Sequence, residues 1–119
     1  MILHIVLYRA RPGLDDAAKR GFVDALAATR AAVPGIRSFW VGRRLEDGPS
    51  YRMSGFPDFP FAAVVAFEDR AGLLAYLQHP LHDAVSQHFN SAAESAFIYD
   101  FEAADVSEIG SMLEGGWRP

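Results

Sequence analysis

The side chains best suited to proton transfer gather in one short stretch, residues 76–82, which reads Tyr-Leu-Gln-His-Pro-Leu-His. An imidazole has an unperturbed pKa of about 6.5 and can therefore take up or release a proton near neutral pH. Proline disfavours helical angles at the residue before it and is favoured in the first turn of a new helix. The helix break at Pro80 therefore predicts that Tyr76, His79 and His82 lie at the mouth of a pocket.

A further histidine, His4, is expected in the same core as His82. If a helix begins at Leu81, His82 opens an apolar stripe at helical spacing, followed by Val85, Phe89 and Ala93. His4 shares one face of an N-terminal strand with Val6 and Tyr8, because side chains alternate along a strand. If both surfaces face the same core, the two imidazoles approach each other.

Plainer interpretations stay open. A histidine on an apolar stripe is often a hydrogen-bonded structural residue, and His79 could simply bond the backbone at the break. His79 and His82 also resemble half of a metal-ligand set. However, Pro80 spoils the regular helical spacing, the chain has no cysteine, and Asp83 is the only carboxylate nearby in sequence. We therefore expect no metal site.

Composition excludes several other classes. The net charge of −4 and the pI near 5.4 disfavour nucleic acid, whose phosphates need a surplus of Lys and Arg. No apolar run approaches the ~20 residues of a membrane span, and no signal-peptide pattern opens the chain. Nucleophile-elbow and phosphate-loop motifs are missing, so we expect no nucleotide cofactor. We expect a cytoplasmic protein.

The periodicity predicts a single domain over residues 1–102. Strands are expected at 2–8, 36–43, 61–68 and 96–102, and helices at 14–33, 70–78 and about 81–95. This βαββαβ order is typical of a ferredoxin-like α+β sandwich with helices on one face of an antiparallel four-stranded sheet. Residues 44–60 are expected to form a loop at the pocket or dimer seam, with Tyr51, Phe56 and Phe59 as its apolar part, and 103–119 a loose tail.

Both faces of the predicted sheet are apolar, although two helices cover only one of them. An exposed apolar face of four strands exceeds what monomers usually present to water, so a second copy of the chain is expected to cover it. The alternative is that the loop and the tail fold over this face. The expected dimer interface consists of Leu3, Ile5, Leu7, Val64, Phe97, Tyr99 and Phe101.

Several of these marks together resemble the stress-responsive dimeric α/β-barrel (Dabb) family. They are His4-Ile-Val, Val33-Pro-Gly-Ile36, Val41-Gly42, Phe67-Glu-Asp, Tyr76-x-x-His79-Pro80-x-His82 and Tyr99-Asp100-Phe101. The resemblance spans about residues 2–102. It implies a ferredoxin-like protomer whose sheet pairs with that of a second copy to close a barrel.

The resemblance also implies candidate site residues. One family member, the plant olivetolic acid cyclase, closes a linear poly-β-ketone by intramolecular aldol condensation, and its residues match His82 as base, Tyr76 as donor and His4 in the pocket. We expect the same roles here on a small apolar carbonyl compound, without a cofactor. The expected substrate-binding residues are Val6, Phe22, Leu26, His79 and Ile98. A non-catalytic ligand-binding or stress-response dimer and a monooxygenase stay as alternatives.

Overall fold

The computed structural model describes residues 1–45 and 57–114 of the 119-residue chain. Four strands form one sheet: β1 (Ile2–Ala10), β2 (Ile36–Arg43), β3 (Phe61–Phe67) and β4 (Ala93–Glu102). The helices are α1 (Asp16–Ala32), α2 (Arg70–Gln78), α3 (Pro80–Ala92) and α4 (Ile109–Glu114), with a short 3₁₀ helix, η1 (Val106–Glu108), before α4.

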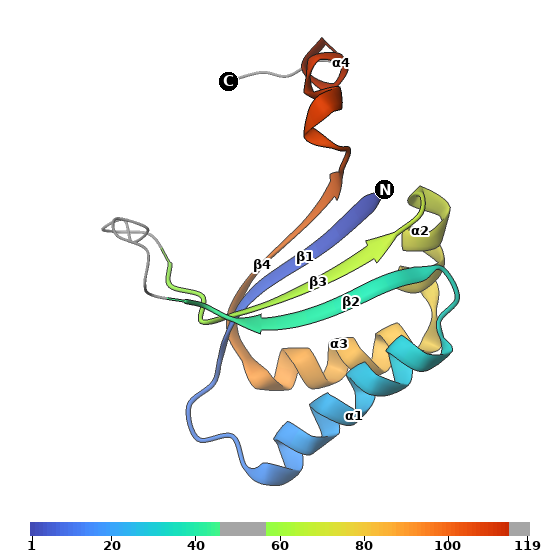
Figure 1. The fold of residues 1–119 in the computed structure, drawn as a ribbon. Coiled ribbons are helices and arrows are strands. Elements are labelled where there is room, and N and C mark those ends of the chain that lie inside the picture. The colour runs from blue at the N-terminus through green and yellow to red at the C-terminus, as the bar shows by residue number, and fades with distance from the viewer. Residues whose placement is uncertain (46–56, 115–119) are drawn as a thin grey trace.

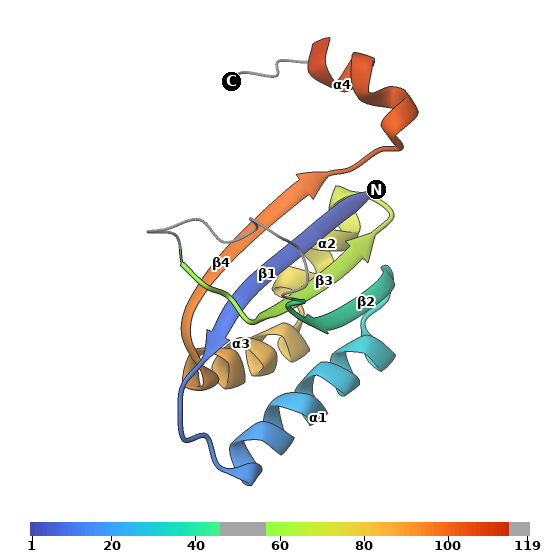
Figure 2. The same cartoon turned by 60° about the vertical axis from the view of Figure 1, so that its left-hand side comes forward.

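The sheet has the order β2-β3-β1-β4, and all neighbouring strands are antiparallel. Helices α1 and α3 lie side by side across one face, which we call the inner face (Figure 1). Seen from a second direction, the opposite face, the outer face, is covered by none of α1, α2 and α3 (Figure 2). The predicted ferredoxin-like α+β fold is therefore confirmed.

Local signals set the ends of the helices. The Asp15 carboxylate accepts a hydrogen bond from the backbone N–H of Ala18 at 2.7 Å and begins α1. In the same way Asp69 accepts from the N–H of Gly72 at 2.9 Å and begins α2. After α1 the chain turns into β2 through Gly35, whose φ of 89° is a conformation that favours glycine.

The core lies between the inner face and the helices, toward the end of the sheet nearest α2. Its side chains are Ile2, Val33, Val65, Phe67, Leu73 and Tyr76. Thr29 of α1 is also fully buried, and its hydroxyl donates to the Ala25 carbonyl at 2.8 Å. The Thr29 hydroxyl is therefore hydrogen-bonded within α1 although it is buried.

The boundary between α3 and β4 differs from the prediction. The helix ends at Ala92 instead of near Ser95, and Ala93 pairs with Ala10 of β1. The N–H of Arg11 also donates to the Ala92 carbonyl at 2.7 Å. Alanine favours helix, but a strand partner is available here because β1 continues to Ala10, so pairing prevails over propensity. Ala93 consequently lies outside the helical stripe that begins at His82.

The tail is not a loose segment, because η1 and α4 lie within it. The Asp105 carboxylate begins η1 by accepting from the N–H of Ser107 at 2.9 Å. Most of the predicted loop, including Tyr51 and Phe56, lies outside the described residues. Of its described part, Phe59 packs on Phe97 with ring centroids 5.2 Å apart, on the outer face.

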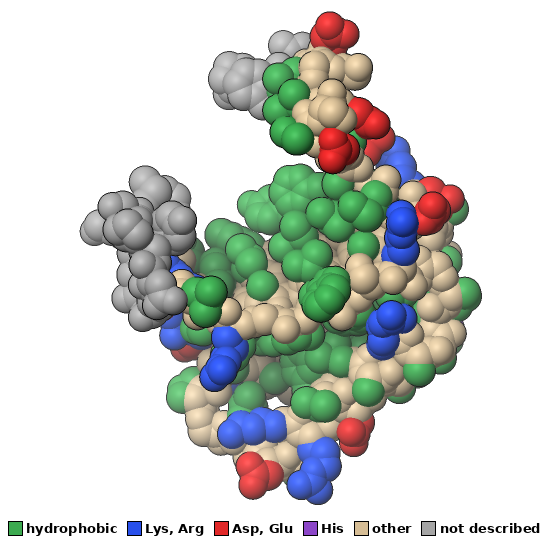
Figure 3. Space-filling model, viewed as in Figure 1, with side chains coloured by type: hydrophobic (Ala, Val, Ile, Leu, Met, Phe, Trp, Pro, Cys, Tyr) green, Lys and Arg blue, Asp and Glu red, His purple; other side chains and the backbone are tan. Residues whose placement is uncertain are grey.

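Hydrophobic side chains gather on the outer face (Figure 3). The pairing register places Trp40, Val64, Ile5 and Tyr99 in one row across all four strands. Trp40 and Tyr99 are 69% and 54% exposed, and Phe97 and Phe101 are also exposed. All residues of α4 are exposed as well, so this helix does not cover the face. The alternative that the tail folds over the outer face therefore fails for residues 103–114.

Candidate active site

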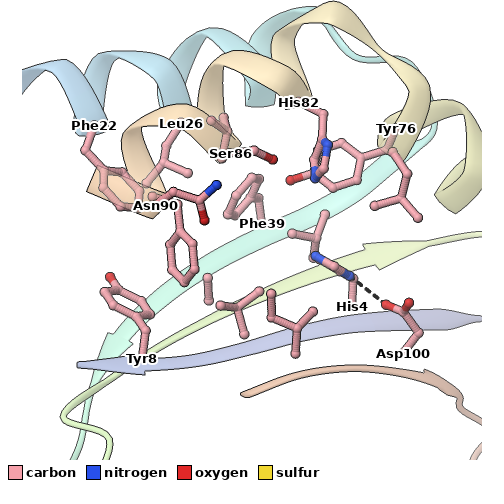
Figure 4. A pocket seen from close by; sticks show the side chains of 17 residues that line it. His4, Tyr8, Phe22, Leu26, Phe39, Tyr76, His82, Ser86, Asn90 and Asp100 are labelled. Carbon is pink, nitrogen blue, oxygen red and sulfur yellow. Dashed lines mark hydrogen bonds and ion pairs between the residues drawn. The ribbon is translucent and has the colours of Figure 1, made fainter. Parts of the chain in front are cut away.

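A cavity of about 310 Å³ lies between the inner face of the sheet and helices α1, α2 and α3 (Figure 4). Its volume is at the lower end of the range for small-molecule sites. Ile98 and Asp100, on the edge strand β4, are both exposed, so the cavity opens between β4 and α3. The lining consists of His4, Val6, Tyr8, Phe22, Leu26, Phe39, Ala63, Val65, Tyr76, Leu77, His82, Val85, Ser86, Phe89, Asn90, Ile98 and Asp100.

One end of the cavity holds four groups that can exchange protons or hydrogen bonds: His4, Tyr76, His82 and Asp100 (Figure 4). The centroid of the Tyr76 ring is 5.8 Å from that of His4 and 4.7 Å from that of His82, both edge-on. The Tyr76 ring therefore neighbours both imidazoles. The four groups come from four elements, with His4 on β1, Tyr76 on α2, His82 on α3 and Asp100 on β4.

His4 is held by a carboxylate from the neighbouring strand. Its Nδ1 lies 2.6 Å from Oδ1 of Asp100, the residue directly opposite it in the β1–β4 ladder. The His4 side chain is 8% exposed, whereas the Asp100 side chain is 42% exposed at the mouth. An Nδ1–H that donates to Asp100 leaves Nε2 for a ligand. Figure 4 shows this second nitrogen pointing into the cavity.

The electrostatics of the site favour a neutral His82. Desolvation by burial lowers the pKa of its imidazole, and the neighbouring His4 lowers it further. The charge of Asp83 and a hydrogen bond to the backbone of Leu77 act in the opposite direction but are weaker. A neutral imidazole is the form that can accept a proton from a substrate.

The helix break leaves the Leu77 carbonyl available to the His82 ring. In a continuous helix this carbonyl would accept from the N–H of Leu81. Here that N–H donates instead to Nδ1 of His79 at 3.1 Å, because His79 is the N-cap of α3. The Leu77 carbonyl can therefore accept a hydrogen bond from one ring nitrogen of His82, and the other nitrogen is the candidate base.

Tyr76 presents a phenol that stays protonated at any physiological pH. Its side chain is 3% exposed and packs on Phe67 with ring centroids 5.4 Å apart. Burial raises the pKa of Tyr76 to about 12. Within the described residues its hydroxyl has no protein hydrogen-bond partner, which leaves it free to donate to a ligand.

The other end of the cavity is aromatic. Tyr8 stacks on Phe22 and Phe61 with centroids 6.3 and 5.4 Å away, and Phe89 meets Tyr8 edge-on at 5.6 Å. Ser86 and Asn90 of α3 place a hydroxyl and an amide between the aromatic end and the imidazoles (Figure 4). The described lining contains no Lys or Arg, so it suits a ligand without negative charge.

Seven of the eight predicted site residues line this cavity: His4, Val6, Phe22, Leu26, Tyr76, His82 and Ile98. His79 does not line it, because its side chain is occupied as the helix cap. Sequence reasoning missed Asp100, Ser86 and Asn90 as pocket residues. Ser86 and Asn90 follow His82 at intervals of four, a spacing that could have revealed them.

In the described part of the chain, no three His, Cys, Asp or Glu side chains come together as a metal-ligand set. No helix in residues 1–45 and 57–114 is both long and apolar enough to cross a bilayer.

Comparisons with known proteins agree with this architecture. Residues 2–103 match the model of the stress responsive A/B barrel domain, Dabb, and the chain therefore belongs to that family. A Dabb family protein from Mesorhizobium loti is 21% identical, with 87% of this chain and 96% of that chain covered and a TM-score of 0.66. It has a ferredoxin-like fold.

Two further solved structures share the fold. A dimeric ferredoxin-like protein of unknown function from Thermobifida fusca is 22% identical, covering 86% of this chain and 90% of its own, with a TM-score of 0.66. The hydroxynitrile lyase of Passiflora edulis is 19% identical, covering 88% and 94%, with a TM-score of 0.70. No curated protein matches the sequence.

Proposed function

We propose that the protein is a homodimeric enzyme that deprotonates a carbonyl-rich small molecule and closes it into a ring without a cofactor. The preferred substrate class is a linear poly-β-ketone, and the reaction is an intramolecular aldol-type condensation. The observation that carries this proposal is the meeting of His4, Tyr76, His82 and Asp100 at one end of an otherwise apolar cavity.

The reaction needs one base and one hydrogen-bond donor. The free ring nitrogen of His82 removes a proton from a carbon between two carbonyls, and the C–H electron pair becomes an enolate. The Tyr76 hydroxyl donates a hydrogen bond to the enolate oxygen. The carbanion then attacks a more distant carbonyl carbon, a carbon–carbon bond forms, and the resulting alkoxide takes back the proton from the His82 imidazolium. Loss of water afterwards gives the unsaturated ring.

The pair of His4 and Asp100 supports this chemistry from the facing strand. With its Nδ1–H directed at Asp100, His4 offers Nε2 to a hydroxyl or enol of the substrate. The aromatic end formed by Tyr8, Phe22 and Phe89 suits the apolar end of the chain. A folded conformation of the substrate then brings the nucleophilic carbon and the distant carbonyl together.

The outer face supports the dimer. Its apolar side chains are exposed in one protomer, and two solved neighbours from Thermobifida fusca and Bacteroides fragilis are described as dimeric. A two-fold pairing of outer faces would bury Leu3, Ile5, Leu7, Val64, Phe97, Tyr99 and Phe101 in each copy. The hydroxynitrile lyase neighbour supports the view that this fold can host an enzyme.

The test is turnover of a linear tetraketide thioester of N-acetylcysteamine, followed by chromatography of the aromatic product. His82→Gln should lower kcat/KM by about 10²–10⁴-fold, the usual contribution of positioned proton transfer. Tyr76→Phe should lower it by about 10- to 100-fold, because it removes one hydrogen bond to a developing charge, worth roughly 1.5–3 kcal/mol.

His88→Gln is the matched control, because His88 is an exposed histidine of the same helix that does not line the cavity. It should keep the wild-type rate. The catalytic assignment is wrong if His82→Gln lowers the melting temperature but retains activity per folded molecule. A wild-type protein that binds the cyclic product tightly yet turns over no tetraketide would identify a non-catalytic ligand-binding dimer.

A further inference from the structure

The C-terminal helix α4 projects from the body of the protein beyond the end of β4 (Figures 1 and 2). The N–H of Ala103 still donates to the Met1 carbonyl at 2.8 Å, which continues the β1–β4 pairing by one residue. After that bond the chain leaves the sheet, and η1 and α4 follow. The family match ends at Ala103, so these helices are an addition to the Dabb domain.

Within residues 1–45 and 57–114, this segment has an apolar side without a partner. Val106, Ile109, Met112 and Leu113 recur at helical spacing and are between 41% and 77% exposed. A helix this short is not stable in water by itself, since isolated helices below about 12–15 residues are marginal. The stripe therefore requires a surface to pack on.

The apolar side of α4 is directed toward the space above the outer face. Figure 3 shows hydrophobic side chains on that side of the helix and on the sheet, with the acidic side chains of the segment on the other side. The space between them is where the proposed dimer places its second copy. The two apolar surfaces thus border the same volume.

The charge of the segment argues against a membrane or a nucleic acid as the partner of α4. Residues 103–114 contain Asp105, Glu108 and Glu114 and no Lys or Arg. An acidic helix is repelled by anionic lipid surfaces and by nucleic acid phosphates. A second copy of this chain satisfies the apolar requirement without opposing the charge.

We infer that α4 packs against the partner protomer. Each copy then contributes one C-terminal helix to the interface, which extends beyond the outer face. Because the dimer is two-fold, both helices make the same contact. This inference rests on the proposed dimer. The four stripe residues are its contact surface, and the acidic side of the helix stays in solvent.

The first test compares dimer dissociation constants by sedimentation velocity of the full chain. The double variant Ile109→Asp with Leu113→Asp should raise the dissociation constant at least about tenfold, which corresponds to about 1.4 kcal/mol. Ser111→Asp is the matched control, because it adds a charge on the opposite side of α4, and it should leave the constant unchanged. An equal dissociation constant for the double variant and the control would overturn the inference.

The second test locates the contact. The chain has no cysteine, so Ser111→Cys gives a single site for a nitroxide label on the solvent side of α4. A nitroxide-labelled copy at natural isotope abundance is mixed with an unmodified copy that is labelled with ¹⁵N. Broadening of amide signals in the unmodified copy is expected, since the label then lies on the partner.

Sharp amide signals in the unmodified ¹⁵N copy, together with broadened outer-face signals in a second sample whose chain carries both ¹⁵N and the nitroxide, would show that α4 folds back on its own protomer. That result would refute the inference alone. A full chain that stays monomeric would refute both the dimer and the α4 contact. Because Val64→Asp addresses the outer face without altering α4, dissociation by that variant but not by the α4 variants would leave the dimer standing and remove only the α4 contact.

Discussion

Val64 offers the sharpest test of the proposed interface, because it lies at the middle of the outer face. It pairs with Ile5 on one side and with Trp40 on the other, in the row that also contains Tyr99. Val64 is already half-buried in the protomer, so a dimer adds part of its burial. Replacing it by aspartate removes apolar area and places a carboxylate between Ile5 and Trp40, neither of which can pair with its charge.

The magnitude follows from these two effects. The lost apolar burial costs about 1 kcal/mol per copy, and a desolvated carboxylate without a partner costs about 2 kcal/mol more. Both copies of a two-fold dimer carry the change, so the total is about 6 kcal/mol. At about 1.4 kcal/mol per factor of ten, Val64→Asp should weaken dimerisation by about 10⁴-fold.

The assay is sedimentation velocity over a wide range of protein concentration, with circular dichroism to verify that the variant is folded. Val23→Asp is the matched control, since Val23 is a 62% exposed valine on α1 and lies away from the outer face. The control should dimerise like the wild type. If Val64→Asp and Val23→Asp dimerise with equal affinity, the outer face is not the interface.

Two further predictions concern the site. Asp100→Asn should change the free energy of unfolding by less than about 1 kcal/mol, because the carboxylate is 42% exposed. It should lower turnover about tenfold, because the carboxylate no longer fixes which nitrogen of His4 carries the proton. Imidazole ¹⁵N shifts that match those of the wild type would contradict this prediction. Burial lowers the pKa of His82, so between that lowered value and the unfolded value of about 6.5 the unfolded chain binds more protons than the folded one. The stability contributed by neutral His82 is therefore complete above about pH 6.5 and decreases as the pH falls through this window. Denaturant unfolding of wild type and His82→Gln at equal protein concentration should show a smaller acid loss in the variant, and parallel pH profiles would argue against a buried neutral imidazole.

The fold followed from the sequence because its signals are local and agree with one another. Alternation in β1 and β3, carboxylate caps at Asp15 and Asp69, and the turn at Gly35 each specify one element. The βαββαβ order then leaves few topologies. The end of α3 was misplaced because the partner of Ala93 is Ala10, more than 80 positions away in the chain, and no local pattern reveals that pairing. The helix α4 was missed because its stripe is short and lies in a segment rich in Gly, Ser and Ala.

The candidate site was partly predictable for the same reason. Periodicity places His4 and His82 on surfaces that face one core, and the break at Pro80 marks the pocket. The role of Asp100 depends on its position opposite His4 in the β1–β4 ladder, which requires the strand order. The role of His79 depends on a cap geometry that diverts one N–H from the Leu77 carbonyl. Both roles depend on contacts in the folded structure, so local sequence patterns do not reveal them.

The strict alternation along β1 and β4 constrains how this protein can evolve. His4, Val6, Ile98 and Asp100 line the cavity, and the residues between them, such as Ile5 and Tyr99, lie on the outer face. Point substitutions can therefore alter the cavity and the outer face independently, within the same strand. An insertion or deletion of one residue would exchange the two sets and place Tyr99 in the cavity and His4 outside it. We expect relatives that diverge in chemistry to keep β1 and β4 at constant length and to vary in length elsewhere.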